Sequence, residues 1–210
     1  MSRMLVCGCV AVLFLAPVVR ADDAEDAAAK WVEGVGGKVT RDATANGKPV
    51  VEVFFGSNKK VTNDGLKELQ GLKNLKSLTV FFCEQITDDG MKHVKGLTTL
   101  EKLSITNTGV GDDGVAALKD LKNLTALKKL KLLYIGGASL TDAAVKDIAD
   151  NMPDLEGLEI GARGLAVTDD SVPHFAKLKK LKALGIRGSK LTDTGLKELQ
   201  KALPNCKITK

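Results

Sequence analysis

The sequence predicts an α/β solenoid, a horseshoe in which a parallel β-sheet lines the concave face and helices cover the convex face. A short apolar triplet recurs along most of the chain, and each triplet is followed by a helix-start motif and then by a segment of helical periodicity. A single unit of this kind cannot bury its apolar face. Stacked units share a continuous core and pair their strands.

The composition fits one well-buried domain. The chain has 210 residues, of which 44% are hydrophobic. Lys and Arg number 31 against 26 Asp and Glu, so the formal net charge is +5. This mild excess does not indicate a nucleic-acid partner.

Residues 1–21 have the pattern of a signal peptide. Arg3 supplies a positive charge, an apolar core runs from Leu5 to Leu15, and residues 19–21 fit a cleavage site. An uncleaved anchor is the alternative, but the apolar stretch is shorter than the roughly 20 residues that span a bilayer. A lipoprotein attached through Cys7 is disfavoured because too few residues precede it. We expect Sec-type export to the periplasm or the exterior, with no transmembrane segment after cleavage.

Residues 22–49 differ from the rest and predict an N-terminal cap. Residues 24–35 are expected to form a short helix and residues 38–42 a strand, and the Asn46–Gly47 pair is a strong hairpin signal. Trp31 is the expected apolar anchor of this cap on the open end of the core.

Residues 50–210 are expected to hold six repeats and a degenerate seventh. Each repeat has apolar residues at its positions one, four and six. Subtraction of residue numbers gives spacings of 25, 25, 30, 25 and 26 between the first members. The interval of 30 residues is expected to place extra residues near Leu121–Leu127 on the helical side. Residues 203–208 are typical of a degenerate last strand. The triplets are Val50/Val53/Phe55, Leu75/Leu78/Val80, Leu100/Leu103/Ile105, Leu130/Leu133/Ile135, Leu155/Leu158/Ile160 and Leu181/Leu184/Ile186.

A helix start follows each triplet. The usual pattern is an apolar residue, Thr-Asp and a small residue, as in the segment Leu191–Gly195. The Thr can cap exposed amides, and the carboxylate lies at the positive end of the helix dipole. Segments such as Leu66–Leu72 then show helical spacing of apolar residues. Each unit is therefore a strand, a turn and a helix.

One repeat carries a family resemblance. The strand Leu75–Val80, followed by Cys83 and by the segment Ile86–Gly90, resembles the cysteine-containing class of leucine-rich repeats, known from F-box proteins whose repeats hold substrates for ubiquitin ligases. From the Gly36–Asp42 cap onward, the chain is more similar to secreted leucine-rich-repeat proteins of planctomycete bacteria. The cap is too small for an F-box, and an export signal contradicts a ubiquitin-ligase role. The resemblance implies a leucine-rich-repeat solenoid that serves as a binding module, with no named partner.

Positions three, five and seven of each repeat are expected to face outward on the concave side. There we expect Phe54, Phe81, Leu132 and Tyr134 to cluster over the N-terminal two-thirds of the sheet. Because the chain has only six Phe, one Trp and one Tyr, this set indicates an interaction patch. Local packing of these rings is an equally weighted alternative. The Gly- and Ala-rich C-terminal third is expected to be flat and weakly binding. The candidate partner-binding residues are Phe54, Thr79, Phe81, Leu132, Tyr134 and Arg187.

The two cysteines of the mature chain are expected to be structural. Cys83 occupies repeat position nine, where a buried side chain turns the chain out of the strand, so a reactive or metal-binding thiol is the weaker reading. Cys206 also faces inward, but several strands away at about 4.8 Å per strand. A disulfide needs Cα atoms within roughly 7 Å, which this fold excludes.

The charged residues fall into two sets. The acidic set could bind Ca²⁺ if its carboxylates converged, but helix capping accounts for all of its members, and we predict no metal site. The basic set could bind polyanions, although a solvated face explains it as well. The acidic set is Asp64, Asp88, Asp89, Asp112, Asp113, Asp142, Asp169, Asp170 and Asp193. The basic set is Lys122, Lys128, Lys129, Lys131, Lys177, Lys179, Lys180 and Lys182.

No catalytic motif is present in the sequence. His93 and His174 lack suitably spaced nucleophile and carboxylate partners, and no phosphate-loop or zinc spacing occurs. We predict a monomeric, non-enzymatic scaffold without cofactors that binds a protein on its concave face. The alternatives are an envelope protein that binds polyanionic polysaccharide or lipid headgroups through its Lys-rich convex face, and a hydrolase with an unrecognised site.

Overall fold

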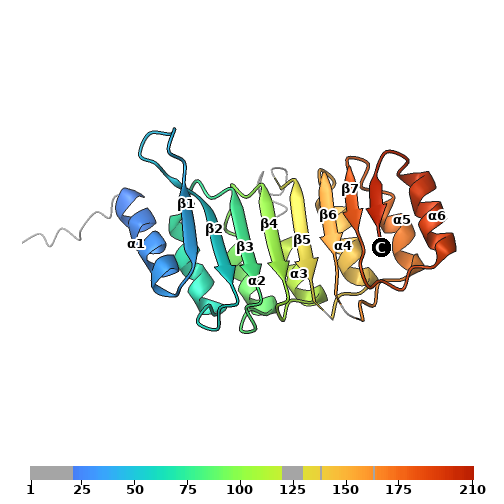
Figure 1. Cartoon of the computed structure of the whole chain (residues 1–210), viewed down its shortest axis with the longest axis horizontal. Helices are drawn as coiled ribbons and strands as arrows, with labels where there is room; N and C mark the ends of the chain where they lie inside the picture. The colour runs from blue at the N-terminus through green and yellow to red at the C-terminus, as the bar shows by residue number, and fades with distance from the viewer. Residues whose placement is uncertain (1–20, 120–129, 138, 163) are drawn as a thin grey trace, which may run out of the picture.

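The predicted α/β solenoid is confirmed by the computed structural model, which describes residues 21–119, 130–137, 139–162 and 164–210. The described strands form one eight-stranded sheet in chain order from β1 to β8. The helices lie together behind this sheet (Figure 1). We call the side of the sheet opposite the helices the sheet face; it is the face predicted to be concave.

Strands and helices alternate along the repeats. The strands are β1 (Lys38–Arg41), β2 (Val50–Gly56), β3 (Ser77–Phe81), β4 (Lys102–Thr106), β5 (Leu132–Gly136), β6 (Gly157–Ile160), β7 (Ala183–Gly185) and β8 (Lys207–Thr209). The described α-helices are α1 (Ala21–Gly34), α2 (Asp88–Val94), α3 (Asp112–Lys119), α4 (Asp142–Asn151), α5 (Val172–Phe175) and α6 (Asp193–Ala202), and the described 3-10 helices are η1 (Asp64–Gly71) and η3 (Asp169–Ser171).

The apolar triplets set the register of the sheet. From β2 to β8 all pairs are parallel, and residues at the same repeat position are neighbours, as in the row Val53, Leu78, Leu103. Every member of the six triplets is buried. These side chains meet the apolar faces of the helices in one continuous cluster. The alternation of inward and outward residues therefore follows directly from the sequence pattern.

The N-terminal end of the core is covered by α1 and β1. Strand β1 pairs antiparallel with β2, and Gly47 in the connecting loop has a φ of 76°, which suits glycine. The indole of Trp31 is half-buried and packs edge-on against Phe55, with ring centroids 5.8 Å apart. Val32 is fully buried on the same helix.

Several details differ from the sequence-based expectations. The helix expected at residues 66–72 is the 3-10 helix η1. The degenerate last strand is β8, whose register with β7 is set by the pairing of Lys207 with Ala183. Residues 1–20 of the expected signal peptide and the insertion near residues 121–127 lie outside the described residues. Within the part of the chain that the structure describes, no helix is long and apolar enough to cross a membrane.

Four of the aspartates for which helix capping was the expected role also connect neighbouring repeats: Asp88, Asp112, Asp142 and Asp169. Asp88 accepts hydrogen bonds from the N–H groups of Gly111 and Gly114, at 2.7 and 2.9 Å. The same relation joins Asp112 to Thr141, Asp142 to Thr168, and Asp169 to Thr192. In the first repeat Asn63 takes this place opposite Thr87. We call this series the Asx ladder.

Candidate partner-binding surface

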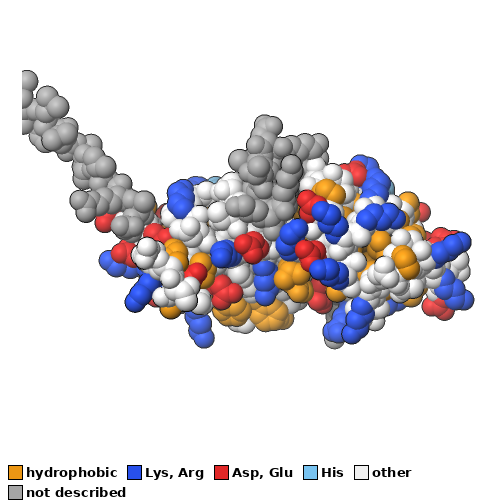
Figure 2. All heavy atoms as spheres, turned by 90° about the horizontal axis from the view of Figure 1, so that it is seen from above, with side chains coloured by type: hydrophobic (Ala, Val, Ile, Leu, Met, Phe, Trp, Pro, Cys, Tyr) orange, Lys and Arg blue, Asp and Glu red, His pale blue; other side chains and the backbone are white. Residues whose placement is uncertain are grey.

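The sheet face has a defined pattern of rows. Strand register places Phe54, Thr79, Ser104, Tyr134, Glu159, Gly185 and Thr209 in one row across the sheet. Seen from above, hydrophobic side chains gather along the lower margin of Figure 2, on the sheet side of the N-terminal half. Two groups of residues account for the apolar character of this face.

The first group is the phenylalanine cluster, formed by Phe54, Phe81 and Phe82. These are the exposed large hydrophobic residues of the described chain, with 44%, 38% and 49% of their surface accessible. The rings of Phe81 and Phe82 meet edge to face, with centroids 4.5 Å apart and planes at 89°. A Cβ atom built on Gly56 would lie 2.6 Å from the Phe54 ring. Because Gly56 pairs with Phe81, the Phe54 ring extends toward its neighbours in the cluster.

The sequence pattern did not identify Phe82 as a surface residue of this face, because Phe82 follows the strand at repeat position eight. Its φ is +51°, in the left-handed region. Ser57 and Asn107, at the same position of the adjacent repeats, have φ values of +50° and +54°. The N–H groups of all three donate to carbonyls of the next repeat, as from Phe82 to Thr106 at 3.1 Å. These three consecutive repeats share a conformation that a bulky residue rarely adopts.

The second group is Leu132 and Tyr134 on β5, both half-buried. The Lys102 ammonium lies 5.8 Å from the centroid of the Tyr134 ring, within the range of a cation–π contact. A Cβ on Gly157 would lie 2.7 Å from a methyl carbon of Leu132, so this side chain leans over β6. Strand β4, with outward-facing Ser104, separates this group from Phe81. The structure therefore divides the expected cluster in two.

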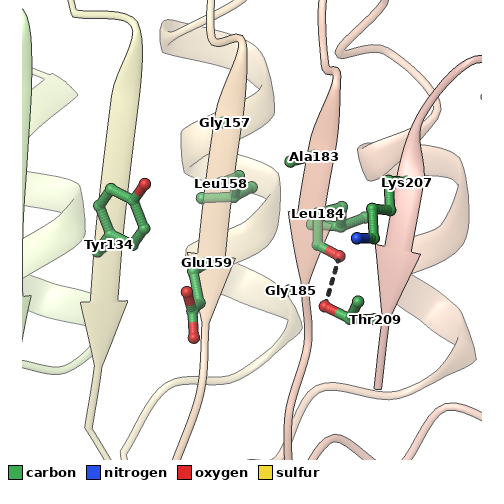
Figure 3. Close-up of a pocket in the computed structure, with 9 residues that line it drawn as sticks. All are labelled: Tyr134, Gly157, Leu158, Glu159, Ala183, Leu184, Gly185, Lys207 and Thr209. Atoms are coloured by element: carbon green, nitrogen blue, oxygen red, sulfur yellow. Dashed lines mark hydrogen bonds between the residues drawn. The ribbon is translucent and has the colours of Figure 1, made fainter.

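The C-terminal third of the sheet face is hollowed, which corrects the expectation that it is flat. A depression of about 240 Å³ lies over β6 and β7, and Figure 3 shows its lining residues. Gly157, Ala183 and Gly185 have little or no side chain, so the neighbouring Tyr134 and Glu159 stand above the floor. The lining residues are Tyr134, Gly157, Leu158, Glu159, Ala183, Leu184, Gly185, Lys207 and Thr209.

The other two candidate residues lie in different surroundings. Thr79 is half-buried between Phe54 and Ser104 in the central row. Arg187 is exposed just after β7, and its Cβ lies 3.7 Å from the place of a Cβ on Gly161. Arg187 is thus several strands from the phenylalanine cluster, so the six candidate residues do not form one contiguous site.

The described lysines of the basic set are mostly paired with carboxylates. Lys177 contacts Asp150 at 2.7 Å and Lys180 contacts Asp154 at 2.5 Å, each reaching back to the preceding repeat. Lys182 and Lys131 both contact Glu156, at 2.6 and 3.7 Å. Lys179 donates instead to the carbonyl of Ala202. Lys122, Lys128 and Lys129 lie outside the described residues. This pairing argues against a concentrated positive patch at the described positions.

Asp150 shows the electrostatic effect of this pairing. Hydrogen bonds from Lys146 and Lys177 lower the pKa of its carboxyl group from 3.8 to about 2. The Glu156 pKa is also lowered, chiefly by its hydrogen bond from Lys182. Both carboxylates therefore remain ionised at neutral pH and hold the lysines in place.

The thiols are separate and protected. Cys83 and Cys206 are buried and unpaired, and burial raises the pKa of each thiol. Cys83 follows β3 and Cys206 precedes β8, so their repeats are five strands apart. Neither thiol has the depressed pKa that favours a nucleophile.

Comparisons with known proteins agree with this architecture. A family profile described as a leucine-rich repeat matches residues 71–93 and 96–119. Internalin C2 of Listeria monocytogenes is similar in structure, with a TM-score of 0.51 and 18% sequence identity, over 91% of this chain and 84% of the internalin chain. A leucine-rich-repeat protein of Leptospira interrogans aligns with a TM-score of 0.45 and 20% identity, over 69% of this chain and 33% of its own. No curated protein sequence matches the chain. At 18% identity, the likeness to internalin C2 shows the fold alone.

Proposed function

We propose that this leucine-rich-repeat solenoid is a monomeric, non-enzymatic scaffold that binds a protein partner on its sheet face. The observation that carries the proposal is the placement of the exposed large hydrophobic residues. Those of the described chain all lie on the sheet face or at its edge, as the phenylalanine cluster. A contiguous exposed apolar group on a soluble surface marks an interaction site more often than a scattered one does.

The remainder of the sheet face supports the same proposal. Tyr134 combines a flat apolar ring with a polar tip, a side chain enriched at the energetic centres of protein interfaces. The depression beside it offers a complementary recess of about 240 Å³. Between Tyr134 and the phenylalanine cluster, Ser104 and Thr106 are small and half-buried, so a partner can approach the backbone closely.

The proposal is tested by blocking the centre of the sheet face. Ser104 lies on β4 between Thr79 and Tyr134, and Ser104→Arg places a long charged side chain there without altering the core. Thr194→Arg, at an exposed position of α6, is a matched control on the helical side. Both variants and the wild type, each beginning at Asp22, are immobilised and used to capture proteins from the envelope and culture-medium fractions.

A protein retained by the wild type and by Thr194→Arg, but lost from Ser104→Arg, is the expected result. A partner lost from Thr194→Arg alone would move the binding site to the helical side. Retention that collapses at modest ionic strength and requires Lys177 or Lys182 would favour polyanion binding instead. Hydrolysis in a broad activity screen would contradict the non-enzymatic part of the proposal.

We also propose that the protein is exported to the periplasm or the exterior. The basis is the sequence pattern of residues 1–21. Cleavage after Ala21 would leave nearly all of α1, which begins at that residue. Recovery of protein with Asp22 at its N-terminus from a periplasmic or extracellular fraction is the expected result. A protein found only in the cytoplasm with Met1 intact would contradict it.

A further inference from the structure

We propose that the phenylalanine cluster is an anchor site that receives an apolar side chain of the protein partner. This inference rests on the proposed function, since it names the part of the sheet face that recognises the partner and the chemistry it recognises. Three features of the cluster support this role: the backbone at Phe82, the arrangement of the three rings, and the area that they expose.

The backbone at Phe82 has a conformation that is unfavourable for a bulky residue. Repeat position eight has a positive φ in three consecutive repeats, at Ser57, Phe82 and Asn107, and again at Gly188. Glycine and asparagine tolerate this conformation best, whereas a bulky side chain is strained in it. The next repeat shows that asparagine is compatible with the same turn. Folding therefore gives no backbone reason for phenylalanine at this position.

Burial does not supply the reason either. Phe82 remains 49% exposed, and its ring packs edge to face against that of Phe81, which is itself 38% exposed. A residue that is strained and exposed is more often kept for function than for stability. The pair holds two rings at 89°, which forms a corner with one ring face and one ring edge. Phe54 extends toward this corner from β2.

The exposed area indicates which occupant fits. A phenylalanine side chain contributes about 200 Å² when fully accessible, so three at these exposures offer on the order of 250 Å². A stable interface needs about 800 Å² on each partner, so the cluster is too small to hold a second copy of this chain by itself. It matches one or two apolar side chains at the centre of a larger contact, as interface anchors do.

The first experiment uses a phage-displayed library of random linear peptides as the probe. Selection on the wild-type chain is expected to enrich peptides that share a large aliphatic or aromatic residue. These peptides should bind Phe82→Asn about tenfold or more weakly, the loss of one interface anchor. Failure to enrich peptides, enrichment without an apolar residue in common, or equal binding to both proteins would overturn the proposal.

The stability of Phe82→Asn distinguishes a recognition role from a structural one. Asparagine relieves the strain at a positive φ, so the urea midpoint of the variant is expected to rise. Lost binding in a more stable protein cannot be attributed to misfolding. A lower midpoint would mean that Phe82 stabilises the fold by packing on Phe81, and it would contradict a recognition role for Phe82.

Two outcomes separate this inference from the proposed function. If a captured protein is lost from Ser104→Arg but is retained by Phe82→Asn and by Phe54→Ser, the sheet face binds the partner and the anchor site falls. Sedimentation of the wild type provides the other control. A dimer that Phe82→Asn dissociates would assign the cluster to a second copy, which would also overturn the proposal.

Discussion

Asp142 and Thr168 are joined by two hydrogen bonds across a repeat boundary. The Asp142 carboxylate accepts from the Thr168 N–H group and from its hydroxyl group, both at 2.8 Å, and also from the Ser171 hydroxyl. Thr168 in turn accepts from the Asp170 N–H group at 3.2 Å. The carboxylate of one repeat thus positions the threonine that caps the following helix, which links local capping to the stacking of repeats.

Loss of this contact is expected to destabilise the solenoid. Asp142→Ala leaves donors of half-buried Thr168 and buried Ser171 unpaired, and we expect a loss of about 2 kcal/mol in the free energy of unfolding. Asp142→Asn should lose less, because Asn63 makes the equivalent contacts with Thr87. Urea denaturation measures both changes.

Asp113 supplies the control for the Asx ladder. It is exposed in the first turn of α3, where its effect is limited to the helix dipole, so Asp113→Ala should cost only about 0.5 kcal/mol. Equal losses for Asp113→Ala and Asp142→Ala would show that the ladder adds nothing beyond helix-dipole effects.

The ion pairs of Asp150 predict a small loss of folded-state stability at acid pH. Its pKa is lowered to about 2 by Lys146 and Lys177, so the ion pairs stabilise the folded state fully above the ordinary carboxyl pKa of 3.8. This contribution is lost as the pH falls from about 4 to about 2. The carboxylate is 34% exposed, and screening limits the effect to about 0.5 kcal/mol.

The measurement is an NMR titration of the Asp150 carboxyl carbon. Lys177→Gln removes one of its two cations, so the midpoint is expected to move up toward the ordinary range. A midpoint near 3.8 in the wild type would show that the ion pairs seen in the structure do not persist in solution.

Gly137 tests the close approach of neighbouring repeats. A Cβ atom at this position would overlap the carbonyl oxygen of Val110, a backbone atom that cannot rotate away. We expect Gly137→Ala to destabilise the fold by about 2 kcal/mol, a typical cost of overpacking. Gly34, at the end of α1, has open space around it, so Gly34→Ala should be neutral or stabilising. Thermal unfolding of the two variants, side by side, provides the comparison, and a Gly137→Ala protein as stable as wild type would contradict the register.

Tyr134 tests the contribution of the second apolar group. Its side chain is half-buried on the sheet face and contacts Lys102, so Tyr134→Ala should leave the melting temperature nearly unchanged. Binding of the captured partner is expected to weaken about tenfold, as for a typical interface tyrosine. Unchanged affinity would confine recognition to the phenylalanine cluster.

Sequence periodicity predicted which residues face the core, because a strand alternates sides at every residue and a misplaced register would expose the triplets. The periodicity could not predict which side chains of neighbouring repeats contact one another. The division of Phe81 from Tyr134 depends on the intervening β4, and the link from Asp142 to Thr168 depends on the stacking of two helix starts. The surface over Gly157 and Gly185 was expected to be flat. It is a depression, because the larger side chains of neighbouring residues project above these small residues.

Phe82 was missed for a different reason. Position eight lies outside the alternating strand positions, so the pattern assigned it no face. The presence of Asn107 and Gly188 at the same repeat position was the available signal, because asparagine and glycine tolerate a positive φ. Phenylalanine is the exception in that series.

The most direct test of the interaction scaffold is the dissociation constant of the captured partner for the wild type, Ser104→Arg and Thr194→Arg. A side chain that blocks the centre of an interface should raise the dissociation constant by about a hundredfold, whereas a change outside it should alter it by less than about twofold. We predict the large effect for Ser104→Arg and the small one for Thr194→Arg. Equal affinities for Ser104→Arg and the wild type would contradict binding on the sheet face.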